Sequence, residues 1–165
     1  MEVLIQTLTN IMENKTTSKN LFITGAPGVG KTYHAMEIIN DLRAAWDKTR
    51  TSAQKFGDEL YKVYNCSELM MYARVPNLAI QYYKDAARCS VLLLDDLGVG
   101  RKSDFIPDII YMIVDARLQH NKQTIVTSNL SLSEISELID DRLASRLSSY
   151  EYMKMQGEDR RLVRK

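Results

Sequence analysis

The sequence predicts an α/β fold, a three-layer α-β-α sandwich built on a mostly parallel five-stranded sheet. Two observations lead to this prediction. Short apolar runs alternate along the chain with longer segments in which apolar residues recur three and four positions apart, and these are the patterns of strands and helices. A glycine-rich segment connects the first expected strand directly to a helix. Regular alternation of this kind is typical of a parallel sheet covered by helices on both faces.

Length and composition agree with a single globular domain. The chain has 165 residues, of which 45% are hydrophobic and 26% are charged, ordinary values for a protein with its own core. The net charge of +1 does not indicate nucleic-acid binding by the chain as a whole. No apolar run approaches the ~20 residues of a membrane span, and the first residues lack the features of a secretory signal. We therefore expect a cytoplasmic protein with no membrane partner.

The N-terminal part of the chain is expected to hold two strands. Residues 2–14 have the pattern of an amphipathic helix, and a polar stretch leads to strand 21–24, which is apolar and rich in strand-forming residues. Apolar residues recur at helical spacing over 31–48, and the polar residues 49–58 predict a loop. Residues 60–65 alternate in polarity as a half-buried strand does.

Helices and strands continue to alternate through the rest of the chain. Ser67 is expected to cap a short helix that ends near Arg74, and Pro76 separates it from a helix over 77–88. The continuous apolar run 90–95 predicts a strand buried on both faces. The remaining elements follow from the same patterns: a loop at 97–103, helix 104–119, strand 123–127, a helix from Ser131 or Ser133 to Ile139, helix 140–149 and strand 150–155.

A phosphate-binding loop is the most specific feature of the chain. The pattern G-x-x-x-x-G-K-[ST] is matched at every fixed position by Gly25, Ala26, Pro27, Gly28, Val29, Gly30, Lys31 and Thr32, and Tyr33 follows as a further candidate nucleotide contact. Backbone N–H groups of such a loop and the positive end of the next helix both favour phosphate. We expect Lys31 to reach the β- and γ-phosphates of ATP, and the Thr32 hydroxyl to bind Mg²⁺.

Two aspartates at the end of strand 90–95 supply the second half of the predicted site. Ligands collect at the carboxyl ends of strands in open α/β sheets. We expect Asp95 to hold Mg²⁺, mainly through water, and Asp96 to orient or deprotonate an attacking water. Strand 60–65 comes between the loop and these acids in the chain, which suggests a sheet in which another strand separates the two. That arrangement is the additional-strand branch of the P-loop NTPases, where water attack on the γ-phosphate is typical.

Polar residues near the C-terminus have two interpretations each. Asn129 follows strand 123–127 and could contact the γ-phosphate and the attacking water, or could only form an Asx turn. Arg146, which shares a helix face with Arg142, could act as an arginine finger on a neighbouring subunit, which requires oligomers. The alternative is a solvated helix with local Asp–Arg pairs. Residues 158–165 are rich in arginine and lysine, and a basic C-terminal segment of this kind is usually only a solvated tail.

Together these motifs resemble the AAA+ ATPases and, within them, the DnaC/DnaI/IstB group. The resemblance extends from about residue 20 to residue 161, and it rests on the order and spacing of residues 25–32, 94–98, 124–130, 141–147 and 157–161. It implies Walker A roles for Lys31 and Thr32, the Walker B role for Asp95, sensor 1 for Asn129, the arginine finger for Arg146 with Arg142 in support, and a place near sensor 2 for Arg161.

One residue departs from the pattern of the family. Asp96 stands where most AAA+ proteins have a catalytic glutamate. The side chain is one methylene shorter, so we expect hydrolysis to be slow and stimulated by partners. The Asp-Asp-Leu-Gly form is more similar to Gram-positive and phage helicase loaders than to IstB.

The resemblance also implies domain organisation and function. We expect one AAA+ domain over residues 1–165, with a helix and linker at 1–20, a core at 21–155, a basic tail at 156–165 and no separate helicase-docking domain. The implied protein is an ATPase that binds ATP or ADP with Mg²⁺, self-associates through Arg146, assembles on single-stranded DNA and helps load a replicative hexameric helicase of the DnaB type in a bacterial or phage-infected cell.

Several parts of this interpretation stay open. Arg101 and Lys102, in the loop after the two acids, are possible DNA contacts, although such residues are more often plain surface charges. An IstB-like helper of a transposase would share the same ATPase machinery and act on a different partner. A nucleotide-gated adaptor with little hydrolysis is the third alternative.

Overall fold

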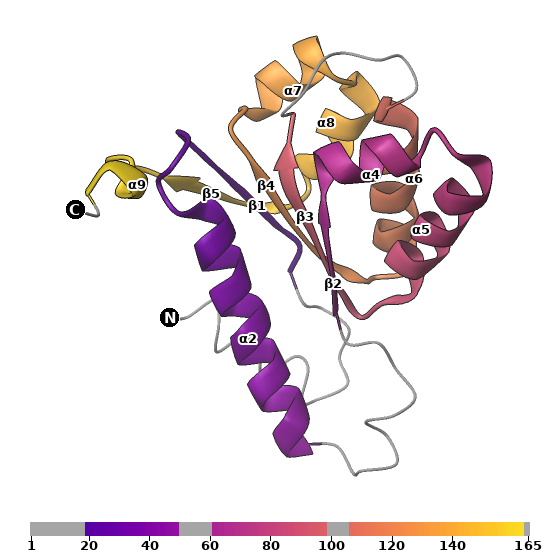
Figure 1. Cartoon of the computed structure of the whole chain (residues 1–165), viewed down its shortest axis with the longest axis horizontal. Coiled ribbons are helices and arrows are strands. Elements are labelled where there is room, and N and C mark those ends of the chain that lie inside the picture. Colours follow the sequence, from indigo (N-terminus) through magenta and orange to yellow (C-terminus); the bar gives the residue numbers. More distant parts are fainter. Residues whose placement is uncertain (1–18, 50–60, 99–105, 164–165) are drawn as a thin grey trace.

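Five parallel strands form a sheet at the centre of the molecule (Figure 1). The computed structural model describes residues 19–49, 61–98 and 106–163. In spatial order the strands are β2 (Tyr61–Asn65), β3 (Val91–Leu97), β4 (Gln123–Ser128), β1 (Leu21–Gly25) and β5 (Glu151–Met155). The predicted α/β fold with a five-stranded sheet is therefore confirmed.

The order of the strands places the two halves of the predicted site close together. Strand β4 lies between β1, which leads into the phosphate loop, and β3, which carries Asp95. The strand that separates β1 from β3 is thus β4, which comes after both of them in the chain. Strand β2, which comes between them in the chain, lies at the edge of the sheet beside β3. Because all these strands run in the same direction, the residues at the carboxyl ends of β1, β4 and β3 meet at one end of the sheet.

Helix α2 (Lys31–Thr49) covers one face of the sheet (Figure 1). Its buried residues Ala35, Ile39 and Leu42 pack in one apolar cluster with Ile23 of β1 and Leu93 of β3. Apolar burial of this kind contributes about 25 cal/mol per Å². The helix begins at the last residues of the phosphate loop, so its packing on the sheet fixes the position of that loop.

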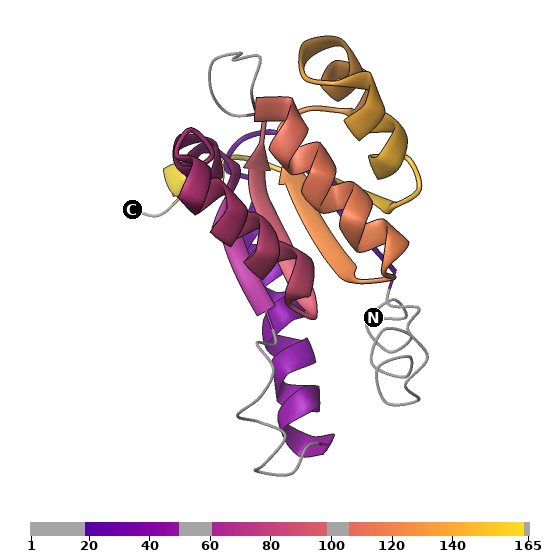
Figure 2. The ribbon, with the colours of Figure 1, turned by 90° about the vertical axis from the view of Figure 1, so that its right-hand side faces the viewer.

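The opposite face is covered by α4 (Cys66–Tyr72), α5 (Pro76–Arg88) and α6 (Ile106–Gln119). Figure 2 shows α5 and α6 side by side over this face. Helices α7 (Leu132–Leu138) and α8 (Asp141–Leu147) lie toward the carboxyl ends of the strands (Figure 1). Phe22, Leu92 and Leu94 belong to this second cluster, because successive residues of a strand point to opposite faces.

Three element boundaries settle points that the sequence left open or placed differently. Helix α4 begins at Cys66, not Ser67, because the side chain of Asn65 accepts hydrogen bonds from the backbone N–H groups of Ser67 and Glu68 and so caps the helix. Ser131 caps α7 in a capping box with Glu134. Strand β3 continues to Leu97, two residues beyond its predicted end.

Some predicted features lie outside the described residues. These are the amphipathic helix 2–14, most of the loop 49–58, and the candidate DNA contacts Arg101 and Lys102. Within the described ranges, no helix is long and apolar enough to cross a membrane.

A buried arginine joins α5, the two residues before β3, and β4 at the end of the sheet opposite to the predicted site. Arg117 of α6 is 0% exposed. Its guanidinium donates hydrogen bonds to the backbone carbonyls of Ala86, Cys89, Ser90 and Gln123. It also donates to the Thr124 hydroxyl at 2.9 Å. Sequence patterns did not indicate this residue, because its partners come from two other segments, 86–90 and 123–124.

Replacing Arg117 with methionine is expected to lower the free energy of unfolding by about 3 kcal/mol or more, because several buried carbonyls lose their donor at once. Urea denaturation measures this change. Arg88→Met is the matched control, since Arg88 is exposed at the end of α5 and surface changes are usually within about 0.5 kcal/mol. Equal stability of the two variants would show that these hydrogen bonds do not hold the fold together.

Candidate nucleotide-binding site

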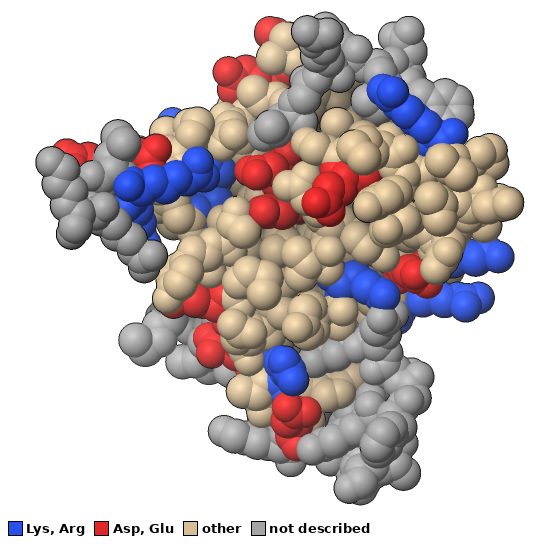
Figure 3. All heavy atoms as spheres, in the orientation of Figure 1, with Lys and Arg blue, Asp and Glu red and all other residues tan. Residues whose placement is uncertain are grey.

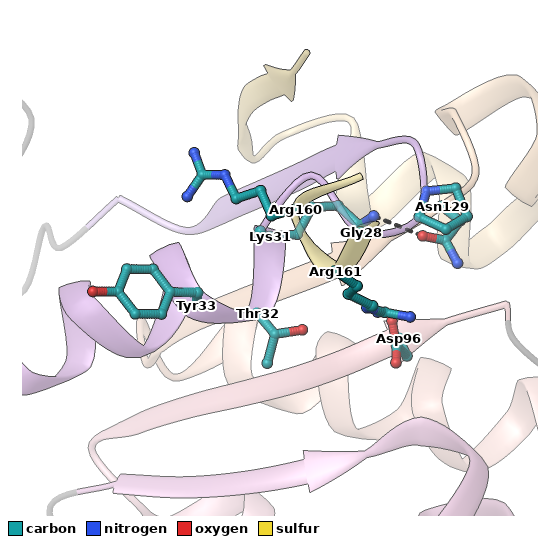
Figure 4. Close-up of a pocket in the computed structure, with 10 residues that line it drawn as sticks. Gly28, Lys31, Thr32, Tyr33, Asp96, Asn129, Arg160 and Arg161 are labelled. Atoms are coloured by element: carbon teal, nitrogen blue, oxygen red, sulfur yellow. Dashed lines mark hydrogen bonds between the residues drawn. The ribbon is translucent and has the colours of Figure 1, made fainter. Parts of the chain in front are cut away.

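A pocket of about 730 Å³ opens at the carboxyl ends of β1, β3 and β4. Its lining residues come from the phosphate loop, the start of α2, the ends of β3 and β4, and α9 (Arg160–Val163) (Figure 4): Pro27, Gly28, Gly30, Lys31, Thr32, Tyr33, Asp96, Asn129, Arg160 and Arg161. In Figure 3, basic side chains gather over α9 beside acidic side chains nearer the middle of the view. The volume and the mixed charge suit a magnesium-bound nucleoside phosphate.

Gly28 shows why the loop requires glycine. Its φ of +79° is in the left-handed region, which costs other residues about 1–2 kcal/mol. A Cβ atom at this position would also collide with the carboxylate of Asp159. The C-terminal segment is held there by the backbone N–H of Arg160, which donates to the carbonyl of Gly28 at 3.0 Å. Only a residue without a side chain allows this close packing.

Lys31 lies at the floor of the pocket, where it is 5% exposed. Its ammonium donates to the carbonyls of Gly25 and Ala26 at 2.8 Å and to the Asn129 side chain at 2.6 Å. Burial lowers the pKa of Lys31, and the nearby carboxylates of Asp96 and Asp95 oppose this shift. An anionic phosphate in the pocket would offset the burial by giving the ammonium a partner of opposite charge.

Thr32 and Asp95 meet beside Lys31. The Thr32 hydroxyl lies 2.9 Å and 3.1 Å from the two carboxylate oxygens of Asp95. A hydroxyl and one carboxylate suit Mg²⁺, which is usually held by one or two carboxylates, waters and substrate phosphates. No cluster of three or more His, Cys, Asp or Glu side chains suitable for a metal ion occurs among the described residues. The donor set therefore fits magnesium bound together with a nucleotide better than a metal held by protein side chains alone.

Asp96 lines the pocket in an unusual backbone conformation. Its φ is +57°, a value that non-glycine residues rarely adopt. The pairing of β3 with β4 shifts register at this point, since Leu94 pairs with Val126 and Leu97 pairs with Ser128. Two residues of β3 thus stand opposite one residue of β4, which is the definition of a β-bulge.

Asn129 and Arg161, which the sequence pointed out, both line the pocket. Arg160 also lines it, and sequence reasoning missed this contribution. The family resemblance gave a role near sensor 2 to Arg161 alone, and the other basic residues of the tail were expected to be solvated. In the structure the carboxylate of Asp159 accepts from the backbone N–H of Arg161 at 2.9 Å, and the start of α9 lies against the phosphate loop, where the backbone N–H of Arg160 donates to the carbonyl of Gly28.

Arg146 and Arg142 lie outside the pocket, on α8. The Nε atom of Arg146 donates to Asp115 of α6 at 2.6 Å, and Arg142 pairs with Asp108 and Asp140. Both guanidinium groups lie near the Tyr111 ring, at 4.8 Å for Arg142 and 5.8 Å for Arg146. Since the Arg146 side chain is 42% exposed, it is available to a second molecule.

The other predicted site residues support the pocket from behind or lie at its edge. Gly25 and Ala26 contribute the carbonyls that bind Lys31. Val29 is 2% exposed and belongs to the core. Asp95 is 9% exposed and reaches the site through Thr32. Tyr33 is 64% exposed at the rim of the pocket, where a nucleotide base or ribose could stack against it.

Comparison with known proteins identifies the family. The sequence model of the IstB-like ATP binding proteins matches residues 3–149. The chain belongs to this family. It is thus an ATP-binding AAA+ protein of the DnaC/DnaI/IstB group, as the motifs implied, and the pocket at the carboxyl ends of β1, β3 and β4 is its candidate nucleotide site.

The individual relatives described next share less than a quarter of their residues with this chain. The replicative helicase loader DnaC of Escherichia coli is 24% identical to this IstB-like protein over 132 residues, which cover 78% of this chain and 49% of DnaC. The chain thus spans about half the length of that relative. Among solved structures, DnaI superposes with a TM-score of 0.72 at 21% identity, covering 94% of this chain and 81% of that chain. DnaA bound to AMPPCP and single-stranded DNA gives a TM-score of 0.68 at 19% identity, covering 93% and 45%. At these identities the structures show a shared fold.

Proposed function

We propose that this IstB-like protein is an ATP-hydrolysing helicase loader of the DnaC/DnaI type, which assembles on single-stranded DNA and helps place a replicative hexameric helicase on it. One observation carries the proposal: Lys31, the Thr32–Asp95 pair and Asp96 surround a single pocket in a chain of this family. A lysine, a hydroxyl and two carboxylates beside a phosphate loop can supply the phosphate contact, the magnesium ligands and the group that positions water for phosphoryl transfer.

Each side chain has a separate task in the proposed reaction. Lys31 donates to the β- and γ-phosphate oxygens of ATP. Thr32 and Asp95 would hold Mg²⁺, which when bound neutralises the charge of the phosphates. Asp96 orients the attacking water or accepts its proton, and Asn129 contacts the same water and the γ-phosphate. Because the Asp96 side chain is shorter than glutamate, turnover is slow until a partner improves the geometry.

The proposed ATPase is completed by a second copy of the chain. Arg146 is held at the surface by Asp115 and does not line the pocket of its own molecule. It therefore acts on the γ-phosphate of a neighbouring subunit. This arrangement makes ATP turnover depend on assembly, so that a loader would hydrolyse ATP only after its subunits have assembled on DNA.

The choice of partners rests on the relatives. DnaC is a replicative helicase loader, and a DnaA neighbour in fold has been solved with single-stranded DNA. For this chain we propose a DnaB-type helicase and single-stranded DNA as partners, with Arg101 and Lys102 as candidate DNA contacts.

Two measurements on the full chain test this function. We expect single-stranded DNA to stimulate ATP hydrolysis, and ATP to change the amount of a DnaB-type hexameric helicase that copurifies with the protein from its source cell. Tight ATP binding without turnover, even with DNA present, would instead indicate a nucleotide-gated adaptor. Bending of duplex DNA together with a transposase partner would indicate an IstB-like helper.

A further inference from the structure

The two acids of the site are arranged by the β-bulge in β3. In a regular strand Asp95 and Asp96 would point to opposite faces of the sheet. Here they occupy the bulge between the Leu94–Val126 and Leu97–Ser128 pairs, and bulges commonly redirect a side chain beside an active site. As a result Asp95 contacts Thr32 while Asp96 lines the pocket.

Thr127 is the single residue of β4 that stands opposite this bulge. Its side chain is 0% exposed. Its hydroxyl donates to the Oδ1 atom of Asp95 at 2.6 Å and accepts from the backbone N–H of Asp96 at 3.0 Å. One hydroxyl group thus binds the carboxylate of the first acid and the backbone of the second.

We propose that Thr127 is a positioning residue that sets both acids of the nucleotide site through its hydroxyl group. The donated hydrogen bond fixes the rotation of the Asp95 carboxylate, so that the group stays turned toward Thr32. The accepted hydrogen bond holds Asp96 in its left-handed conformation, which otherwise has an energetic cost. This inference rests on the proposed function of the site, and it assigns to β4 a role that the phosphate loop and the two acids do not supply.

The decisive comparison is between Thr127→Val and Thr127→Ser. Valine has nearly the same shape without the hydroxyl, whereas serine keeps it. Loss of the partner that orients a metal-binding carboxylate typically costs about 10–100-fold in metal affinity or activity. We therefore expect Thr127→Val to lower kcat by about 10–100-fold and to raise, by a similar factor, the Mg²⁺ concentration that gives half-maximal ATP binding. Thr127→Ser is expected to restore most of both.

A second buried threonine provides the matched control. Thr24 of β1 is 4% exposed, and its hydroxyl donates to the carbonyl of Leu130 at 2.8 Å. Thr24→Val therefore removes a buried hydroxyl that contacts neither acid, and it is expected to keep the Mg²⁺ dependence of the wild type. Thermal unfolding of each variant separates a loss of fold from a loss of positioning. Should Thr127→Val fail to fold because a methyl group replaces the hydroxyl beside Asp95, Thr127→Ala removes the hydroxyl and puts no atom in its place.

The outcomes distinguish this inference from the proposed function. If Asp95→Asn loses Mg²⁺-dependent ATP binding while Thr127→Val and Thr127→Ala match the wild type in kcat and in Mg²⁺ dependence, the role of Thr127 is disproved and the site stands. If Asp95→Asn itself leaves both quantities unchanged, the proposed function of the site is wrong.

Discussion

Lys31→Met is expected to weaken ATP binding by about 30-fold to several thousandfold, which corresponds to the 2–5 kcal/mol lost when a buried charged partner is removed. The ammonium is nearly buried at the floor of the pocket and already donates three hydrogen bonds there. In the proposed complex with ATP, these donors would turn to phosphate oxygens, which are partners of opposite charge. Methionine keeps much of the length of the side chain, so the change removes charge more than volume.

Isothermal titration with ATP and Mg²⁺ measures this affinity. Lys84→Ala is the control, because Lys84 lies exposed on α5. The ATP affinity of this variant is expected to equal that of the wild type. A thermal unfolding curve shows whether the Lys31 variant keeps its fold after losing the hydrogen bonds to Gly25, Ala26 and Asn129. A folded Lys31→Met protein that binds ATP normally would contradict the assignment of this pocket.

Arg146→Ala is expected to leave ATP affinity nearly unchanged and to lower the assembled, DNA-stimulated turnover by about a thousandfold, the lower end of the 10³–10⁵ measured for arginine fingers. The physical reason is location. Arg146 lies on α8, paired with Asp115 and absent from the lining of its own pocket. Under the proposed function, Arg146 would stabilise transition-state charge in a neighbouring molecule. The ion pair with Asp115 lies at the protein surface, where such pairs contribute little to stability, so the variant should fold.

Mixing experiments test action between subunits. An Asp95→Ala subunit lacks its own metal-binding carboxylate but still offers Arg146, so adding it to Arg146→Ala protein is expected to restore part of the activity. Asp115→Asn breaks the ion pair while keeping the arginine, and it should retain most of the turnover. Absence of rescue in mixed assemblies would argue against a finger supplied by a second copy. A loss of activity in Asp115→Asn equal to that in Arg146→Ala would point to a structural effect at α6 and α8.

Patterns confined to short segments were read correctly from the sequence. The strands and the phosphate loop depend on residues within a few positions of one another, and local patterning therefore predicts them. The same patterns left the cap of α7 open between Ser131 and Ser133, and the structure shows Ser131. The cap of α4 lies two residues earlier than the expected Ser67, because Asn65 and Ser67 are both polar residues that could cap the helix and Asn65 does so. Nothing in the run of apolar residues before Asp95 signalled that β3 would continue through a bulge, since the bulge depends on pairing with β4.

The sequence by itself predicted the α/β fold, because strand and helix patterns alternate along the chain. It also predicted the phosphate loop and the two acids, because each is a short motif of contiguous residues. Only the tertiary structure decided how these parts meet. It placed β4 between β1 and β3, brought Thr127 against both acids, and packed Asp159 and Arg160 on Gly28. These contacts join segments that are far apart in the chain, and their geometry follows from packing in three dimensions, which no local pattern of residues encodes.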